Sequence, residues 1–578
     1  MKRKLTYDQI LFILLMVLGL SPMLQGWFHI IPFKPLKGVV EEVEKPSIKP
    51  GSYVSGDYAK QAEAYVSQHV GFREPFIRFY NQYLWSFYHK TYANDVVAGK
   101  KGWLYYPQSV RDYYGQELLR WHPSVEAARE KFDREVKYLN WIRSILQENG
   151  VEFLVFMAPE KSFLYPEYLP DDAFDTTTVS FNACDYFAQR LEETGFPHIE
   201  MTRWFQKMKD TVDYPLIPQV GAHWIFPSVY AADSLSRLME ELKGFSMPKI
   251  KIGEAYPVSN KDHDYDNDLE LHLNLAFPLR HQFGYCPRHR VSVEQDSTTV
   301  NPKVLFIGNS YFWAMNLFVP LTQMFETTEY WYYFSTAYYG DSLTETANVN
   351  RMDLVEKLLD FDCVVWFTTG NQMNKGTSGF AEKVITNLCY SKKETDRYKN
   401  VVIDSLRYDS LTLLTMDEPL ADSNYRRLLW SKAEQEVYSH AERYFPDLAS
   451  DSLPQARNPR IKEVLAIKEI KKDSVWMWNL ANCQTIIQNA SLEQVLLMEA
   501  HNSMEGKPLM RDMPEVVAKR DRVEKLVREV EDEIRNKPDL MEKIRKKAEE
   551  RGQTVEKQTL LEAKWIVNDK IKRGVVKL

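Results

Sequence analysis

The sequence predicts an α/β protein in which a mainly parallel sheet is flanked by helices. Three observations predict this class. Short apolar runs alternate with segments of helical periodicity through the middle of the chain, a nearly uncharged stretch lies near the amino terminus, and a charged, glycine-poor region forms the last part. Alternating helices and apolar strands favour a parallel sheet that is covered on both faces, with its functional residues at the carboxyl ends of the strands.

The amino-terminal stretch predicts a transmembrane anchor. Lys2, Arg3 and Lys4 precede a nearly uncharged run over residues 10–33. A positive flank before an apolar segment of this length orients a helix with its amino terminus in the cytoplasm. A cleaved signal peptide is the competing interpretation, but no small-x-small cleavage site follows the apolar segment, which favours an uncleaved anchor. We therefore expect a cytoplasmic tip and anchor over residues 1–33 and a tether over residues 34–57.

The middle of the chain, residues 58–400, is expected to form one α/β domain. Apolar positions recur at helical spacing from Glu126 to Asn149, and this pattern stops at Gly150, before the strand-like run Val151 to Met157. The same alternation then continues along the chain. Further helices are expected over residues 181–193, 228–242, 313–325 and 352–359, and further strands over residues 198–201, 304–310, 330–334 and 363–368.

The last part of the chain, residues 401–578, is expected to be α-helical. Two of its segments, residues 460–502 and 523–572, share several residues at a constant offset, such as Ser491-Leu492-Glu493 and Thr554-Val555-Glu556. Two related helical units are one interpretation. Two unrelated amphipathic segments that share a few frequent residues are the other. In either case we expect a packing or docking region, because nothing in it is arranged for catalysis.

Charge and cysteine content exclude two classes of function. The net charge is −7 over 578 residues, and the lysines and arginines are interspersed with acidic residues. Nucleic-acid binding requires a basic patch, so no nucleic-acid partner is expected. The five cysteines are scattered and odd in number, so they predict neither a disulfide framework nor a zinc site, although one disulfide is compatible with an oxidising compartment. We expect no metal site.

Ser310 is the first candidate nucleophile. The run Val304 to Ser310 has the pattern of a buried strand that ends in Gly-Asn-Ser, and the apolar, aromatic residues 311–318 follow at once. Such a strand places a serine at the edge of a sheet, and the next helix supplies backbone N–H groups where an oxyanion forms. A serine hydroxyl needs a base within hydrogen-bond reach, and the best candidate is His223. Taken alone, the two residues are more simply a helix N-cap and a structural histidine.

Four stretches connect these two residues to a known family. They are Val97 to Tyr105, Ala158-Pro159-Glu160-Lys161 with Tyr165-Pro166 and Leu169-Pro170, His223-Trp224, and Ile307-Gly308-Asn309-Ser310. In this order they resemble the alginate O-acetyltransferase family, the AlgX- and AlgJ-like proteins with an SGNH-hydrolase-like domain. Asp268-Leu269 and the strand over residues 363–367 follow the family's order as well. The resemblance covers about residues 70–390, so the last third lies outside it.

The resemblance implies an O-acetyltransferase of the bacterial inner membrane, with a single pass, a cytoplasmic amino terminus and a periplasmic catalytic domain. Its Ser-His-Asp triad would take acetyl onto the serine and pass it to a hydroxyl of a cell-surface or secreted polysaccharide. The acetyl donor is expected from a multi-spanning membrane acyltransferase or an acyl carrier, with no cofactor held by this chain. Ser310 takes the nucleophile's place and His223 the general base's, while the residues expected to line the site or its oxyanion hole are Gly308, Asn309, Tyr311, Trp224 and Asn371.

Two positions depart from the family pattern. Gly221 stands two residues before the histidine, where the family has the aspartate that orients the imidazole. Asp210, Asp213 or a carboxylate from the run over residues 262–268 are candidate substitutes, and the sequence does not choose among them. Asn309 stands where the family usually has aspartate, a milder change because position and backbone N–H matter more than charge to an oxyanion hole.

Three functions therefore stay open. Acetyl transfer to a polysaccharide is the leading one. The second is an acetyl esterase that uses the same Ser310 and His223, because water can replace the sugar hydroxyl unless the site excludes it. The third is a catalytically inert relative that binds polysaccharide or scaffolds an export complex, an alternative that Gly221 favours.

Overall fold

A computed structural model describes residues 6–38, 43–47, 52, 55–171, 181–256, 266–279, 283–407, 422–472, 477, 490–550 and 553–576. The chain divides into two compact units. Unit 1 comprises Met1–Met352, Phe361–Ile385 and Glu434–Arg443, and unit 2 comprises Asp353–Asp360, Thr386–Ala433 and Tyr444–Leu578. The units interleave along the sequence, so the single domain boundary expected at residue 400 stays a prediction.

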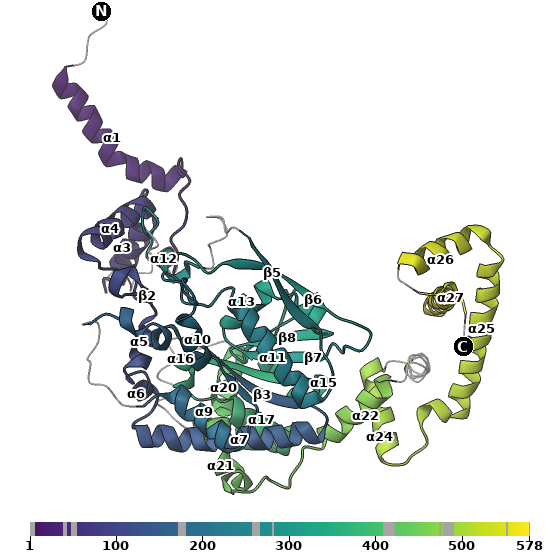
Figure 1. Ribbon diagram of the computed structural model, residues 1–578. Helices are drawn as coiled ribbons and strands as arrows, with labels where there is room; N and C mark the ends of the chain where they lie inside the picture. The colour runs from purple at the N-terminus through teal and green to yellow at the C-terminus, as the bar shows by residue number, and fades with distance from the viewer. Residues whose placement is uncertain are drawn as a thin grey trace, which may run out of the picture. The chain divides into compact units, whose positions relative to one another are not determined.

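A seven-stranded sheet forms the centre of unit 1, in the order β10-β9-β8-β7-β11-β3-β4 (Figure 1). The strands from β4 to β8 in this order are parallel to their neighbours, and β9 and β10 extend the sheet as antiparallel strands. The predicted mainly parallel sheet flanked by helices is therefore confirmed. The strands are β3 (Glu152–Ala158), β4 (His198–Glu200), β7 (Lys303–Gly308), β8 (Thr327–Tyr332), β9 (Thr336–Tyr339), β10 (Glu345–Asn348) and β11 (Cys363–Thr369).

The antiparallel edge is the part of the sheet that the sequence does not predict. β9 and β10 are only four residues long, and most of their side chains are partly or fully exposed. No continuous apolar run therefore marks them, whereas β3 and β11 are buried throughout. Tyr333 and Phe334 adopt positive φ angles of 50° and 52° and turn the chain back after β8.

Helices cover both faces of this sheet, because its central strands are apolar on both sides (Figure 1). On one face, α11 (Ser228–Lys243) and α13 (Tyr311–Phe318) share a core with Phe156 and Phe367. On the other face, Phe187 of α9 (Ala183–Glu193) contacts Trp366. α7 (Val125–Glu148) packs next to α9 through Phe132 and Phe187.

Short elements complete unit 1. The helix expected over residues 313–325 is in fact two, α13 and α14, because Pro320 interrupts it. A second small sheet pairs β5 with β6. The remaining elements are β1 (Val97–Ala98), η1 (Lys100–Gly102), β2 (Leu104–Tyr105), α5 (Pro107–Tyr113), α6 (Leu118–Trp121), α8 (Lys161–Leu164), η2 (Pro166–Tyr168), α10 (Thr202–Lys209), β5 (Lys249–Tyr256), α12 (Asp268–His272), β6 (Arg288–Glu294), α14 (Leu321–Met324), η3 (Val349–Arg351) and α16 (Gly370–Met373).

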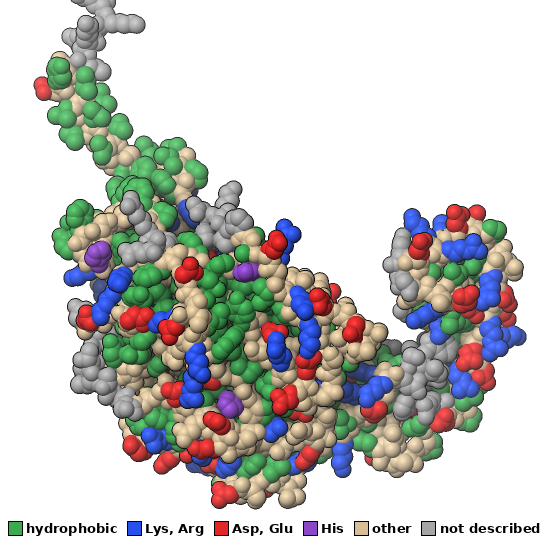
Figure 2. Space-filling model, viewed as in Figure 1, with side chains coloured by type: hydrophobic (Ala, Val, Ile, Leu, Met, Phe, Trp, Pro, Cys, Tyr) green, Lys and Arg blue, Asp and Glu red, His purple; other side chains and the backbone are tan. Residues whose placement is uncertain are grey.

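The amino-terminal helix α1 (Tyr7–Phe28) is, among the described residues, the one helix long and apolar enough to cross a membrane. Its most apolar window has a mean hydropathy of 1.9 and is 6% buried, and Figure 2 shows hydrophobic side chains along it. The predicted apolar helix is confirmed. Part of the segment predicted as a tether contacts the domain: the Lys37 N–H donates to Asn274 Oδ1 (2.8 Å), and Arg78 donates to Pro35 O (2.9 Å). Two helices follow it, α3 (Asp57–His69) and α4 (Arg73–Tyr88).

Unit 2 is helical in its described part, as predicted for the carboxyl-terminal region. One apolar cluster joins α22 to α24, and a second joins α25, α26 and α27. The sequence match at an offset of 63 residues falls on two helix N-caps, because Ser491 caps α24 and Thr554 caps α27. The described helices of unit 2 are α15 (Leu354–Asp360), α18 (Lys392–Arg407), η4 (Pro446–Ala449), α22 (Arg460–Lys472), α24 (Leu492–Met504), η5 (Met510–Asp512), α25 (Pro514–Arg535), α26 (Pro538–Glu550) and α27 (Val555–Lys572). Three further helices, α17 (Phe380–Cys389), α20 (Asp422–Ser439) and α21 (Ala441–Tyr444), have residues in both units.

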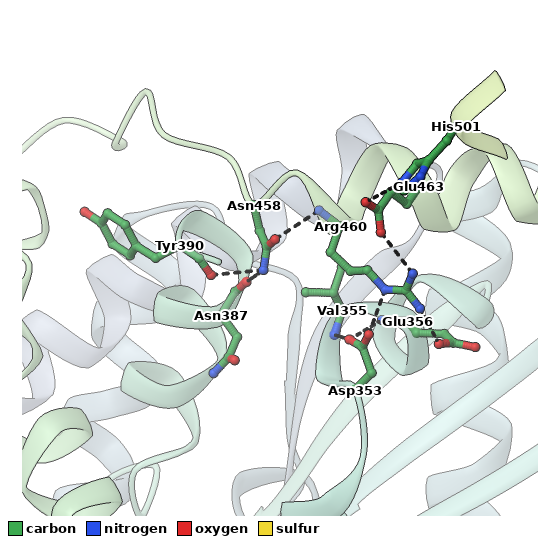
Figure 3. Close-up of polar contacts among 9 residues, drawn as sticks. All are labelled: Asp353, Val355, Glu356, Asn387, Tyr390, Asn458, Arg460, Glu463 and His501. Carbon is green, nitrogen blue, oxygen red and sulfur yellow. Dashed lines mark hydrogen bonds and ion pairs between the residues drawn. The ribbon is translucent and has the colours of Figure 1, made fainter. Parts of the chain in front are cut away.

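Arg460 connects α15 to α22 within unit 2 (Figure 3). Its guanidinium donates to Asp353 Oδ2 (2.8 Å), Glu356 Oε2 (2.9 Å) and Glu463 Oε2 (3.0 Å). Asp353 also accepts from the backbone N–H groups at the start of α15. One arginine therefore holds together the first turns of two helices that are distant in sequence.

Candidate active site

Ser310 lies where the sequence predicts it, at the carboxyl edge of the parallel sheet. β7 ends at Gly308, which is in register with Phe367 of β11, and Ser310 is the N-cap residue of α13. Its side chain makes no capping hydrogen bond to α13. The simpler interpretation of Ser310 as a helix cap therefore does not account for its hydroxyl.

His223 meets Ser310 from a different part of the chain. It lies in the loop between α10 and α11, and its Nε2 is 2.7 Å from Ser310 Oγ. The two residues are 87 positions apart in sequence. The imidazole is only partly exposed, with 21% of its side-chain surface accessible. This distance is what a general base requires in order to accept a proton from a serine hydroxyl.

Asp268 completes the hydrogen-bonded chain. Its Oδ2 is 2.5 Å from His223 Nδ1, and its Oδ1 accepts from the backbone N–H groups of Ala222 (2.8 Å) and Leu269 (3.0 Å). Burial alone would raise the pKa of Asp268, but the hydrogen bond and charge of His223, the Ala222 N–H and the Lys161 ammonium together hold that pKa below its usual value. An ionised carboxylate in this position fixes the proton on Nδ1 and leaves Nε2 free to accept.

Gly221 leaves room for the segment that brings the Asp268 carboxylate to His223. A Cβ on Gly221 would lie 2.6 Å from Asp266 O and 3.1 Å from Asp268 Oδ1. The space beside residue 221, where the family carries its aspartate, is therefore filled by the segment that brings Asp268. Asp210 and Asp213, the other candidates, are exposed, and residues 262–265 lie outside the described residues.

Lys161 holds the histidine loop, the segment between α10 and α11 that carries His223. Its ammonium donates to three backbone carbonyls, those of Leu104 (2.7 Å), Gln219 (2.9 Å) and Gly221 (2.5 Å). The side chain is 2% exposed. Burial lowers the pKa of Lys161 well below its usual value, against the opposing charges of Asp268 and Glu160. All three ammonium donors are used on the backbone, so Lys161 fixes the path of the chain just before His223.

Asn309, the residue before Ser310, fixes the turn between β7 and α13 by hydrogen bonds. Asn309 is buried, and its Nδ2 donates to Gln372 Oε1 (3.0 Å) and Thr369 Oγ1 (3.2 Å). Its Oδ1 accepts from the Tyr311 backbone N–H (3.1 Å). Asn309 therefore ties the end of β7 to the end of β11 instead of pointing a donor at an oxyanion.

Asn371 is the side chain best placed to donate to an oxyanion. It lies in α16, directly after β11, and borders the same small cavity as Ser310 and His223. Within the described part of the chain, its carboxamide makes no hydrogen bond, while its backbone N–H donates to Glu160 Oε2 (3.4 Å). A partly exposed amide that borders the same cavity as Ser310 and makes no other hydrogen bond to the described residues suits an oxyanion donor.

The cavity around these residues is small and is bordered by both polar and aromatic side chains. Its volume is about 90 Å³, and it is bordered by Tyr106, Glu160, Asn309, Tyr311 and Asn371 together with Ser310 and His223. Tyr311 donates its hydroxyl hydrogen to Ala222 O (2.7 Å). A space of this size holds a few waters or one small acyl group.

Trp224 does not border this cavity, in contrast to the expectation. It is fully buried in the core, and its indole N–H donates to Tyr311 O (3.0 Å). Large apolar rings in a closely packed interior hold their neighbours in place. Trp224 therefore joins the histidine loop to α13 within the core.

Sequence reasoning did not assign roles to Glu160, Lys161 or Tyr106. Glu160 is buried, and this burial raises its pKa, against hydrogen bonds and the nearby His223 charge that lower it. One signal was present in the sequence: Glu160 and Lys161 directly follow the apolar run that forms β3. In a parallel sheet, that position lies at the same edge as Ser310.

Comparisons with known proteins identify a related family. Residues 96–242 match the family model described as SGNH hydrolase-like domain, acetyltransferase AlgX. That range contains His223, whereas Ser310 and Asp268 lie beyond it. The match confirms the predicted resemblance to the alginate O-acetyltransferase family.

Two solved structures are similar to the chain. The O-acetyltransferase domain of Pseudomonas putida AlgJ is 14% identical, with a TM-score of 0.33, over 50% of this chain and 98% of that one. Pseudomonas aeruginosa AlgX is 13% identical, with a TM-score of 0.32, over 51% of this chain and 67% of that one. No curated protein sequence matches the chain.

Proposed function

For a chain that carries an SGNH hydrolase-like domain of the AlgX acetyltransferase family, we propose the function of an extracytoplasmic O-acetyltransferase that acts on a polysaccharide. The observation that carries this proposal is the hydrogen-bonded chain from Ser310 Oγ through His223 to Asp268. Three groups in this order, with a partly buried carboxylate of lowered pKa, are the arrangement that activates a serine hydroxyl.

The reaction has two halves. Ser310 Oγ attacks the carbonyl carbon of an acetyl ester while His223 Nε2 accepts the serine proton, and the imidazolium then protonates the departing alcohol or thiol of the donor. In the second half, His223 accepts the proton of a sugar hydroxyl, whose oxygen attacks the carbonyl carbon of the acetyl-serine ester. The bond from that carbon to Ser310 Oγ then breaks, and the imidazolium returns its proton to Ser310 Oγ. Asp268 stabilises the imidazolium in both halves, and the Asn371 amide donates to the tetrahedral oxyanion.

A larger cleft next to the small cavity offers room for the acceptor. Its volume is about 890 Å³. Tyr106 borders the cavity, and the next residues, Pro107 and Gln108, border the cleft. His272, from the same short helix as Asp268, borders the cleft as well. A polysaccharide chain in this cleft would place one hydroxyl close to the acetyl-serine.

The packing of α1 supports an uncleaved anchor. The Gly71 N–H donates to Pro22 O (3.0 Å), and a Cβ on Gly26 would lie 2.7 Å from His69 O. Cleavage after α1 would remove these close contacts from the folded domain. We therefore assign the chain to the bacterial inner membrane as a single-pass protein, with the catalytic domain in the periplasm and acetyl delivered by a multi-spanning membrane acyltransferase.

Two other functions are distinguished from transfer by experiment. An esterase would use the same Ser310 and His223 with water as the acceptor. The inert alternative was favoured by Gly221, and Asp268 now occupies the position of the missing acid.

The test uses the full-length protein in detergent with p-nitrophenyl acetate as donor, with and without an oligosaccharide acceptor. Transfer predicts acetylated sugar by mass spectrometry and faster release of nitrophenol when the acceptor is present. Release of acetate alone under both conditions would identify an esterase. Ser310→Ala should abolish the activity and Ser144→Ala, an exposed serine of α7, should retain it; equal activity in both variants would contradict the proposal.

A further inference from the structure

Helix α4 exposes an aromatic face. Phe76, Phe79, Tyr83 and Phe87 are 66%, 60%, 47% and 72% exposed. Their spacing of three and four residues places them along one side of the helix. Tyr80 and Tyr88 are also exposed, at 52% and 56%. Contiguous exposure of large apolar rings on one helix marks a surface that contacts something else.

The opposite side of α4 contacts its own domain through polar side chains and one buried tryptophan. Asn81 Nδ2 donates to Leu273 O (2.8 Å), and Gln82 Oε1 accepts from the Phe277 N–H (3.0 Å). Trp85 is the single fully buried residue of this helix. A helix on a soluble domain normally turns its apolar face inward and its polar face outward. In α4 the inward side contributes Trp85 to an apolar cluster, and the aromatic rings of the outward side form an additional apolar surface that its own domain leaves exposed.

Helix α1 fixes where this face lies. The turn between α3 and α4 packs directly on the end of α1, through the Gly71 N–H to Pro22 O bond and a contact of Phe33 with Phe72 at 5.7 Å between ring centroids. A Cβ on Gly71 would lie 2.3 Å from Pro22 O, so only glycine permits this approach. Hydrophobic side chains therefore continue from α1 onto the helices beside it, as Figure 2 shows.

We propose that α4 lies in the interfacial layer of the membrane that α1 enters, with its aromatic face among the headgroups and the first acyl carbons. Phenylalanine and tyrosine rings are enriched in this layer, where one end of a tyrosine is apolar and the other is hydrated. Arg73 begins the helix and the exposed Lys90 follows it, which suits anionic headgroups. The inference requires that α1 be retained as an anchor, but it does not depend on the chemistry of Ser310.

Continuity with α1 favours lipid over other occupants. A protein partner or a glycan would need no packed connection between α4 and an apolar helix of membrane-spanning length. The lipid contact also has a consequence for the domain, because it would hold the domain against the bilayer instead of on a free tether. This agrees with the bonds that Arg78 makes to the carbonyls of Lys34 and Pro35.

The test places the photoreactive residue p-benzoylphenylalanine at Phe79 or Phe87 of the full-length protein. The protein is reconstituted in vesicles of phosphatidylethanolamine and phosphatidylglycerol, and the same variants are irradiated in bacterial membranes. Trp204, an aromatic residue of α10 that is 41% exposed, is the matched control position. Because each replacement is aromatic and exposed, folding should be kept, which a thermal unfolding measurement checks.

Lipid adducts at both α4 positions and none above background at Trp204, in vesicles and in membranes, are the expected result. Adducts to a second protein or to a glycan at the α4 positions would overturn the proposal and identify the other occupant. Equal lipid labelling at Trp204, or none at any position, would overturn it as well. Because acetyl transfer is not the readout, failure here is distinguishable from failure of the proposed function.

Discussion

Asp268 Oδ2 lies 2.5 Å from His223 Nδ1, although 45 residues separate the two in sequence. The carboxylate enters from the segment that begins α12, over the space that Gly221 leaves open. The carboxylate that contacts His223 therefore comes from the start of α12 and not from the position two residues before the histidine. This relationship makes the site complete as a serine, histidine and carboxylate in hydrogen-bonded order.

Asp268→Asn should keep the fold and remove most of the activity. The amide can donate to Nδ1 and favour the wrong tautomer of His223, so kcat is expected to fall by about 10²- to 10⁴-fold. Steady-state kinetics with an acetyl ester measure this loss. An activity within a few-fold of the unchanged protein would show that Asp268 has no role in orienting the imidazole.

Asp268 should also make stability depend on pH. Its pKa is lower in the folded state than the ordinary value of 3.8. The stabilisation that Asp268 contributes is therefore fully present above about pH 3.8 and is lost as the pH falls through the folded-state pKa. Unfolding measured between acid and neutral pH should show a smaller difference between Asp268→Asn and the unchanged protein at the acid end. A difference that is constant with pH would contradict the lowered pKa.

Gly221→Ala should disturb the site by crowding. The added methyl group would meet Asp266 O and Asp268 Oδ1, so either the histidine loop or the Asp268 segment must move. We expect a loss of stability of about 1 to 3 kcal/mol and a lower kcat. Gly253→Ala is the control, because there the nearest atom lies at an ordinary 3.4 Å. If Gly221→Ala and Gly253→Ala changed stability and kcat equally, the close contacts at Gly221 would not be the cause of the effect.

Lys161→Met should cost both stability and activity. The change leaves the carbonyls of Leu104, Gln219 and Gly221 without their buried donor, at a cost of about 3 kcal/mol. The histidine loop then loses its fixed path, so kcat should fall while binding of the donor changes less. Lys243→Met serves as the control, since Lys243 donates to a single carbonyl at an exposed position. A variant with normal kcat would reduce Lys161 to a purely structural residue.

Arg460→Met should weaken unit 2 without affecting chemistry. The substitution removes two bonds that join α22 to Asp353 and Glu356 at the start of α15, and one bond to Glu463 within α22 (Figure 3). In this partly exposed setting such pairs contribute about 1 kcal/mol. Thermal unfolding of this variant should begin earlier than that of Arg528→Met, which removes one exposed pair of α25. The acetyl-ester activity should stay unchanged; a large loss would show that this network acts on the site.

The sequence carried enough information to locate Ser310 and His223. A short, continuous apolar run is typical of a fully buried parallel strand, which has no polar positions, and its abrupt end in Gly-Asn-Ser marks the edge of the sheet. The expected strands agree with β3, β4, β7, β8 and β11 to within a few residues. The fold class and the nucleophile's position followed from this pattern.

The positions of Asp268 and Lys161 in the site could not be predicted from the sequence pattern. Asp268 lies in an acidic run in which each carboxylate is an equal candidate, and only the tertiary path past Gly221 selects it. In the sequence, Lys161 resembles an ordinary loop lysine after a strand. Its structural role depends on hydrogen bonds to three backbone carbonyls from two other segments. Burial of a polar side chain is decided by packing between distant segments, which periodicity does not encode.

The most direct test of the account is to trap the acetyl-enzyme. The full-length protein is mixed with an acetyl donor in the absence of acceptor, quenched in acid and digested, and peptides are read by mass spectrometry. The account predicts one acetyl group on Ser310, lost on addition of an oligosaccharide acceptor and strongly slowed in His223→Ala. Acetyl on another residue, or labelling of Ser310 at an unchanged rate in His223→Ala, would contradict it.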